Sequence, residues 1–254
     1  MVGGFVRDML LAGHGGEFGS VIPGKGERYA TRGEKLFASL YCHPRESEDP
    51  FSRGCSVSSR FHEDAKDIDL VTSDPLNTFL PTVQQLSKRH HIMQHYQAVQ
   101  LSFEDYQVTL TRLRYDACCD GRQAEVTFVK TLQEDVWRRD FTINALYADM
   151  QGQVIDFVGG YEDLARKQVR FIGDPETRIK EDVLRILRYV RFCSLLEVPM
   201  DQGMLNVMRP YLSHLQSISP DRLQYEIKKI HKLPLGEKNL EQLMNRHPRV
   251  REDL

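Results

Sequence analysis

The chain has 254 residues, of which 41% are hydrophobic and 28% charged, and its formal net charge at pH 7 is -2. A chain of this length can form one large domain or two small ones. The charge excludes the overall positive field of many nucleic-acid-binding proteins, so any contact with RNA must come from local basic clusters. The sequence shows no apolar run of membrane-spanning length, no signal peptide and no C-x-x-C pair of cysteines. These features predict a cytoplasmic protein.

The first twelve residues predict the end of a strand, a glycine turn and the start of a helix. Gly3 and Gly4 would let a phosphate approach the backbone, and the N–H groups of the helix start could bind it. Arg7 could add a charge-assisted contact to a triphosphate. The alternative, which a glycine pair alone favours, is an ordinary turn with Arg7 paired to Asp8. Residues 13–65 are rich in Gly, Pro, Ser and charge, and they predict a flexible insertion.

Two acids stand two residues apart in the apolar, β-branched segment 67–72, which predicts a strand. Because strand side chains alternate between faces, Asp67 and Asp69 leave the same face. Divalent cations relieve the repulsion between such carboxylates, and pairs of these cations serve phosphoryl and nucleotidyl transfer. The alternative is the tip of an edge strand with two solvated acids. The spacing alone leaves both interpretations open.

Apolar periodicity and turn residues predict the remaining elements. They are a helix over 76–89, antiparallel strands over 96–103 and 106–113, a polar loop over 116–123, a helix over 134–148, a short strand over 154–157, and helices over 178–192, 205–211, 220–231 and 237–244. Asp174 suits a helix N-cap and Pro175 the first helical position, so the chain becomes mainly helical from there. The sequence therefore predicts an α/β head over 1–157, including the insertion, and a helical segment over 158–254.

Arginines and an aspartate open the helix that is predicted over 134–148. Arg139 could reach a phosphate, and Asp140 or Asn144 could hydrogen-bond a ribose hydroxyl. The alternative is a solvated first turn whose charges pair with each other. The sequence by itself favours neither interpretation.

The helix predicted over 178–192 carries a charged residue at every third position. Because a helix turns by about 100° per residue, Asp182 and Arg185 would be adjacent, and Arg188 would flank them. Arg191 would lie further round the helix. A carboxylate acceptor beside a guanidinium donor can recognise a base edge. The alternative is a ladder of ion pairs along the helix, each contributing about 0.2–0.5 kcal/mol.

In this order, these motifs resemble those of the class II tRNA nucleotidyltransferase family, which includes CCA-adding enzymes and bacterial poly(A) polymerases. The matching segments are 3–8, 67–69, 138–146 and 181–192. The resemblance implies an α/β (α+β) nucleotidyltransferase head with an antiparallel or mixed sheet, followed by an all-α neck and a truncated or minimal C-terminal region. It also implies template-independent addition of CCA to the 3′ end of tRNA from CTP and ATP.

The resemblance implies catalytic roles in the head. Gly4 and Arg7 would contact the incoming triphosphate, and the catalytic Asp67 and Asp69 would hold Mg²⁺. The tRNA 3′-hydroxyl would attack the α-phosphate in line, and pyrophosphate would leave. One metal ion would lower the pKa of the hydroxyl, and the other would neutralise the triphosphate.

The resemblance also implies residues that recognise the nucleotide. Arg139 and Asp140 would serve nucleotide and ribose contacts. Asp182 and Arg185 would act as a protein template that selects CTP and then ATP. The residues that support the nucleotide beside them would be Arg188 and Arg191.

Narrower activities stay open, namely addition of CC or A alone, or poly(A) synthesis. The polar loop at 114–122 favours full CCA addition, because the family keeps at this place the loop needed to add A. A catalytically degenerate protein that only binds RNA or nucleotides is the alternative of another class. It is favoured by Gln107, which stands where the family often has an acid, and disfavoured by the intact pair Asp67 and Asp69.

Overall fold

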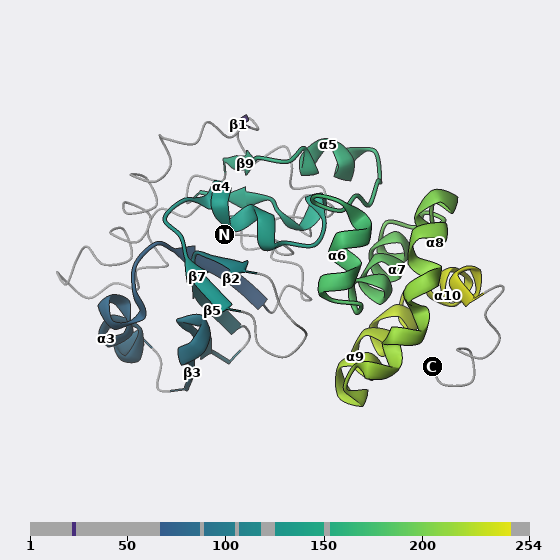
Figure 1. The fold of residues 1–254 in the computed structure, drawn as a ribbon. Helices are drawn as coiled ribbons and strands as arrows, with labels where there is room; N and C mark the ends of the chain where they lie inside the picture. Colours follow the sequence, from purple (N-terminus) through teal and green to yellow (C-terminus); the bar gives the residue numbers. More distant parts are fainter. Residues whose placement is uncertain are drawn as a thin grey trace. The chain divides into compact units, whose positions relative to one another are not determined.

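The computed structural model describes residues 22–23, 67–86, 89–104, 107–117, 125–149 and 153–244. The predicted sites Gly4 and Arg7, and nearly all of the predicted insertion, lie outside these residues. The chain divides into two compact units (Figure 1). The described residues of the head unit fall within Met1–Ala117, Glu125–Arg139 and Ile143–Tyr161, and those of the helical unit within Asp140–Thr142 and Glu162–Leu254.

A four-stranded mixed sheet forms the centre of the head unit (Figure 1). Its strands, in spatial order, are β2 (Asp67–Thr72), β5 (Gln107–Arg112), β4 (Ala98–Ser102) and β3 (His90–Met93). Strand β2 pairs with β5 in parallel, and the other neighbours are antiparallel. The predicted strands and the predicted mixed sheet are confirmed. In the β2–β5 register, Asp67 lies opposite Gln107 and Asp69 opposite Thr109.

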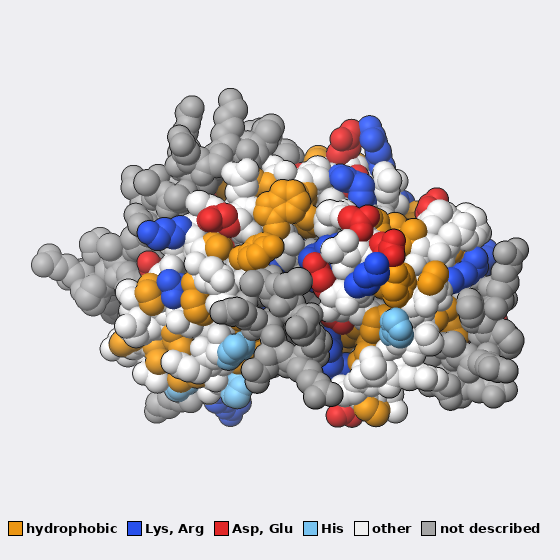
Figure 2. Space-filling model, in the orientation of Figure 1, with side chains coloured by type: hydrophobic (Ala, Val, Ile, Leu, Met, Phe, Trp, Pro, Cys, Tyr) orange, Lys and Arg blue, Asp and Glu red, His pale blue; other side chains and the backbone are white. Residues whose placement is uncertain are grey.

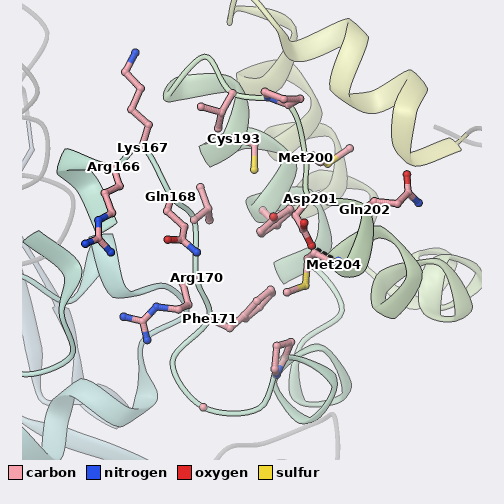
Figure 3. Close-up of a pocket in the computed structure, with 16 residues that line it drawn as sticks. Arg166, Lys167, Gln168, Arg170, Phe171, Cys193, Met200, Asp201, Gln202 and Met204 are labelled. Atoms are coloured by element: carbon pink, nitrogen blue, oxygen red, sulfur yellow. Dashed lines mark hydrogen bonds between the residues drawn. The ribbon is translucent and has the colours of Figure 1, made fainter. Parts of the chain in front are cut away.

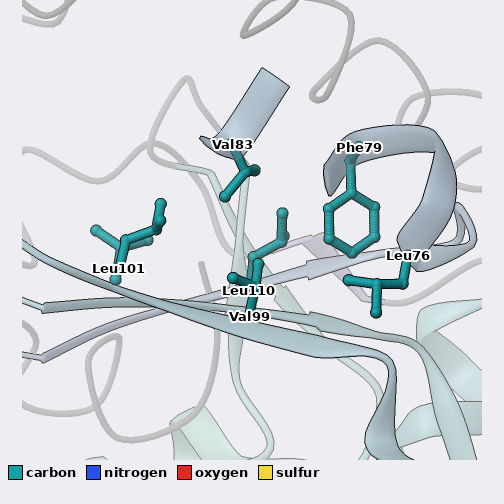
Figure 4. Packing of buried hydrophobic residues seen from close by; sticks show 7 residues of the cluster. Leu76, Phe79, Val83, Val99, Leu101 and Leu110 are labelled. Carbon is teal, nitrogen blue, oxygen red and sulfur yellow. The ribbon is translucent and has the colours of Figure 1, made fainter. Parts of the chain in front are cut away.

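A cluster of buried apolar side chains joins helix α3 (Leu76–Leu86) to one face of this sheet (Figure 4). Its members are Leu76, Phe79 and Val83 of α3, Val99 and Leu101 of β4, and Val108 and Leu110 of β5. Ile68 and Leu70 of β2 are partly buried against this cluster. Because strand residues alternate, positions 67 and 69 belong to the opposite face of the sheet.

Short elements complete the head unit. Strands β6 (Arg114–Ala117) and β7 (Glu125–Phe128) form an antiparallel pair, and a second sheet has the order β1 (Ile22–Pro23), β9 (Val154–Asp156), β8 (Tyr147–Ala148). The turns between β7 and β8 are α4 (Leu132–Asp135), η3 (Val136–Arg138) and η4 (Thr142–Asn144).

The continuous helix predicted over 134–148 is therefore wrong. The backbone becomes extended at Arg139, with φ -75° and ψ 158°, and this ends the helical turns. The carbonyl of Asp140 then accepts from the N–H of Ile172 at 3.0 Å, and the N–H of Thr142 donates to Arg170 at 2.9 Å. These distant backbone partners replace the bonds that a helix would have made.

The long segment of the helical unit begins at Glu162, within α5 (Gly160–Ala165). Its elements are α6 (Pro175–Glu181), α7 (Arg185–Leu195), α8 (Gln202–Met208), η5 (Arg209–Ser217), α9 (Pro220–His231) and α10 (Gly236–Met244). The N-cap prediction is confirmed, because the Asp174 carboxylate accepts from the N–H of Thr177 at 2.8 Å and Pro175 opens α6. A Cβ at Gly236 would lie 1.9 Å from the carbonyl oxygen of Ile230, so the entry into α10 requires glycine.

The described surface is mixed in charge. On the face drawn in Figure 2, acidic and basic side chains are interspersed, in keeping with the small net charge. Among the described residues, none of the helices has the length and apolar character that crossing a bilayer requires.

Candidate active site

The polar face of the head sheet is the first candidate site. It carries Asp69, which is exposed on β2, together with Thr109 and Gln107 of β5 and Gln100 of β4. The Gln100 amide donates to Oε1 of Gln107 at 2.8 Å. Position 67 shares this face by strand alternation, and the side chain of Asp67 lies outside the described residues. The face therefore combines acids with neutral amides and a hydroxyl.

These residues fit Mg²⁺ in one respect and, in another, depart from the family that the sequence resembles. Mg²⁺ in nucleotide-dependent enzymes is typically bound by one or two carboxylates, with waters and substrate phosphates as the other ligands. Asp69, which is exposed, and position 67 on the same strand face would meet that need. Gln107, opposite Asp67, supplies a neutral amide where a third carboxylate could stand. Within the described part of the chain, no three His, Cys, Asp or Glu side chains are grouped closely enough to hold a metal ion.

A buried carboxylate that sequence reasoning missed organises the predicted site residue Arg139. Asp135 is fully buried, and its Oδ2 lies 3.0 Å from both Nη2 of Arg139 and the hydroxyl of Tyr147. Its Oδ1 accepts from Nε of Arg138 at 2.7 Å and from the N–H of Arg114 at 3.2 Å. The sequence does carry one sign of this network, because Arg138 and Arg139 stand three and four positions after Asp135, which are the spacings of helical ion pairs.

The network around Asp135 holds Arg139 inside the head unit. Only 13% of the Arg139 side chain is exposed, and its Nε donates to the Tyr147 hydroxyl at 3.1 Å. Burial alone would raise the pKa of the Asp135 carboxyl, but the charges of Arg138 and Arg139 outweigh burial and hold this pKa below its ordinary value. A nucleotide contact by Arg139 would have to compete with these partners.

A second cluster brings together three predicted site residues in the helical unit. The carboxylate of Asp140 accepts from Nε and Nη2 of Arg188 at 2.6 and 2.5 Å, across 48 positions of sequence. Glu226 of α9, which is 3% exposed, lies 3.6 Å from Arg188 and 2.8 Å from Nε of Arg191. We call Asp140, Arg188, Arg191 and Glu226 the Asp140 cluster. Glu226 was missed because no local pattern connects α9 with α7.

The remaining pair, Asp182 and Arg185, does not lie side by side on one helix, and the prediction of a single helix over 178–192 is wrong. Helix α6 ends at Glu181, Asp182 is extended with φ -150°, and α7 starts at Arg185. Aspartate competes for nearby backbone groups, and Oδ1 of Asp182 accepts from the N–H of Leu184 at 3.1 Å.

The break gives these two residues different partners. Oδ2 of Asp182 lies 3.3 Å from Nη2 of Arg222 on α9. Nη1 of Arg185 donates to the carbonyl of Arg178 at 2.7 Å and to Glu181 at 2.6 Å. Asp182 is the more accessible of the two, with 36% of its side chain exposed against 14% for Arg185.

A pocket of about 820 Å³ in the helical unit lies apart from these residues. Figure 3 shows Arg166, Gln168 and Arg170 on one side of it and Asp201 on the other. No predicted site residue lines this pocket. Burial raises the pKa of the Cys193 thiol in its wall to about 12, so this thiol is not a nucleophile near neutral pH.

Comparison with known proteins gives consistent matches. Residues 58–170 match the family model described as the poly A polymerase head domain. The human mitochondrial CCA tRNA nucleotidyltransferase 1 is 44% identical over 124 residues, which are 48% of this chain and 29% of that protein. The CCA-adding enzyme of Bacillus licheniformis is 33% identical over 186 residues, which are 71% of this chain and 45% of that protein.

A solved structure agrees with these matches. The Bacillus stearothermophilus CCA-adding enzyme in complex with CTP superposes with a TM-score of 0.58 at 30% identity, covering 70% of this chain and 42% of that one. In each of these three comparisons, the aligned part spans less than half of the relative's length.

Proposed function

We propose that this chain, whose residues 58–170 match the poly A polymerase head domain, belongs to the class II tRNA nucleotidyltransferase family and adds CCA to the 3′ end of tRNA from CTP and ATP. The observation that carries the proposal is the strand face that bears positions 67 and 69, with Asp69 exposed, in a chain that is similar to CCA-adding enzymes. The proposed organisation is a head over 1–157 and a helical neck over 158–254. The proposed location is the cytoplasm.

The head residues would bind the reacting groups. Asp67 and Asp69 would hold Mg²⁺, which when bound lowers the pKa of the 3′-hydroxyl and neutralises charge on the triphosphate. Gly4 and Arg7 would contact that triphosphate. The tRNA 3′ oxygen would form a bond to the α-phosphorus of the nucleotide, and the bond to pyrophosphate would break.

The helical unit would choose the base. Asp182 can accept from an exocyclic amine, and Arg185 can donate to a ring nitrogen or carbonyl. Arg188 and Arg191 would support the nucleotide from the Asp140 cluster. Arg139 and Asp140 would serve nucleotide and ribose contacts, Asp140 through its position beside Arg188.

The decisive assay uses Mg²⁺ and a tRNA that ends at the discriminator base. Growth by two nucleotides with CTP alone and by three with CTP and ATP is the expected result. Two nucleotides in both mixtures would identify a CC-adding enzyme, and addition only to a CC-ended tRNA would identify an A-adding enzyme. Repeated addition of A would identify a poly(A) polymerase. No growth under any condition would favour a non-catalytic RNA- or nucleotide-binding protein, which Gln107 also favours.

Asp182→Ala is expected to weaken base selection rather than remove catalysis. A bidentate base contact discriminates by about 1–3 kcal/mol, so the preference for CTP over UTP should fall by about tenfold. The measurement is single-nucleotide incorporation with each of the four nucleoside triphosphates. The matched control is Asp221→Asn, which removes an exposed acid from α9. Unchanged selectivity in Asp182→Ala would contradict the assigned role.

A further inference from the structure

Helix α9 has a buried side and a basic, aromatic exposed side. Glu226, Ile227 and Ile230 are buried. Tyr225 is 57% exposed, the highest fraction among the exposed large hydrophobic side chains of the described residues. Nζ of Lys229 lies 4.2 Å from the centre of the Tyr225 ring. We call Tyr225, Lys228, Lys229 and Lys232 the α9 basic face.

The spacing of these residues places them on one side of the helix. Lys228 and Lys229 stand three and four positions after Tyr225, and Lys232 stands four after Lys228, which are the spacings of helix neighbours. Their Cβ atoms are then about 5–6 Å apart. The result is a local concentration of positive charge in a chain whose net charge is -2.

Among the described residues, the acids at the two ends of this face do not cancel its positive charge. Oε1 of Glu237 on α10 lies 2.5 Å from Nδ1 of His231, so this carboxylate already has a partner. Asp221 lies in the first turn of α9, at the opposite end from Lys232. Lys228 and Lys232 are exposed to solvent, so their ammonium groups are accessible to a polyanion.

The same helix contacts the residues proposed to choose the nucleotide. Arg222 reaches Asp182, and Glu226 reaches Arg188 and Arg191. The α9 basic face begins at the residue next to Glu226 and runs toward the C-terminus of the helix for about 10 Å, at about 1.5 Å per residue. An RNA whose 3′ end reaches the Asp140 cluster would therefore have its preceding nucleotides within reach of this face.

We propose that the α9 basic face binds the sugar–phosphate backbone of the RNA substrate just upstream of its 3′ end, an inference that rests on the proposed function. Lysines that contact phosphates release condensed counterions, which provides affinity without reading sequence. An exposed aromatic ring adds a surface on which a base can stack, whatever its identity. Such sequence-tolerant contacts suit an enzyme that must accept many RNAs with one kind of end.

The test compares RNA binding by the full chain with that of Lys228→Gln/Lys232→Gln. The probe is a fluorescently labelled tRNA that ends at the discriminator base, titrated at about 50 to 200 mM salt. Affinity should fall by about tenfold or more, and the slope of log affinity against log salt should decrease by about two. The matched control, Lys130→Gln/Lys167→Gln, makes the same charge change at exposed lysines elsewhere and should bind as the unmodified chain does.

Tyr225→Ala should weaken RNA binding by about fivefold or more with an unchanged salt slope, because stacking releases no counterions. Tyr161→Ala, at another exposed tyrosine, is its control and should bind normally. In the incorporation assay, the lysine variant should raise the KM for tRNA and keep the rate at saturating tRNA.

The outcomes separate this inference from the proposed function. If the unmodified chain extends tRNA but both α9 variants bind RNA and respond to salt as it does, the inference is overturned, and the face is a solvated surface or a contact for a protein. If the unmodified chain binds RNA through this face without extending it, the proposed activity fails and the RNA surface stands.

Discussion

Asp69→Asn is expected to abolish nucleotide incorporation while the head unit stays folded. The change removes a proposed Mg²⁺ ligand, and a loss of at least about 10³-fold, or about 4 kcal/mol in the barrier, should follow. Asp69 is exposed, so its replacement leaves the apolar cluster under the sheet untouched. The measurement is single-turnover incorporation of CTP into tRNA, with tRNA affinity measured on the same sample.

The control for this variant is Asp74→Asn, which makes the same charge change in the turn that follows β2. It should keep incorporation close to that of the unmodified chain. Asp67→Ala should behave like Asp69→Asn and retain RNA binding. Full incorporation by either of these two variants would contradict the assignment of the acid pair to metal binding.

Of the substitutions proposed for this chain, Asp135→Ala is expected to lower the free energy of unfolding the most. The substitution leaves the guanidinium groups of Arg138 and Arg139 without the carboxylate that each contacts within about 3 Å. Removing one partner of a buried ion pair typically costs about 3–5 kcal/mol. Chemical denaturation would measure the loss as a lower midpoint. Glu162→Ala, which breaks the exposed pair with Arg166, should cost about 1 kcal/mol or less.

Acid should reduce the difference between Asp135→Ala and the unmodified chain. The folded-state pKa of Asp135 lies below its ordinary value, so the carboxylate contributes its stability fully above the unfolded pKa of about 3.9. That contribution is lost as pH falls through the folded pKa. Denaturation at neutral pH and at decreasing pH below about 4 would check this. A constant difference across that range would mean that Asp135 acts through packing rather than charge.

The secondary structure could be predicted wherever the spacing of apolar residues along the chain matched the residues that are buried in the fold. The alternation in β2, β4 and β5 follows directly from one face packing on α3. Helix α9 was predicted with its observed bounds, because its apolar positions recur at helical spacing and a proline opens it. Local periodicity was sufficient in these segments.

The two failures share a physical cause. After Arg139 the backbone pairs with residues 170–172, and the Asp182 side chain accepts from the N–H of Leu184, which in a continuous helix would have donated to the carbonyl of Lys180. Both interactions override helix propensity, and neither can be recognised from the spacing of apolar residues along the sequence. Asp135 and Glu226 could not be identified from the sequence for the same reason, because their roles in the two charge networks depend on tertiary burial. The mutual spacing of Asp182 and Arg185 was therefore misread, although both residues were identified.

The charges of the Asp140 cluster balance one another. Asp140 and Glu226 contribute two negative charges, Arg188 and Arg191 two positive ones, and contacts of about 2.5 to 3.6 Å connect them. Such a set has little long-range field, so it orients groups without attracting polyphosphate from solution. The α9 basic face, one helix side away, has the opposite character. The proposed capture of a polyanion and the proposed support of the nucleotide therefore involve different surfaces of α9, and ionic strength is expected to change the first while leaving the second unaltered.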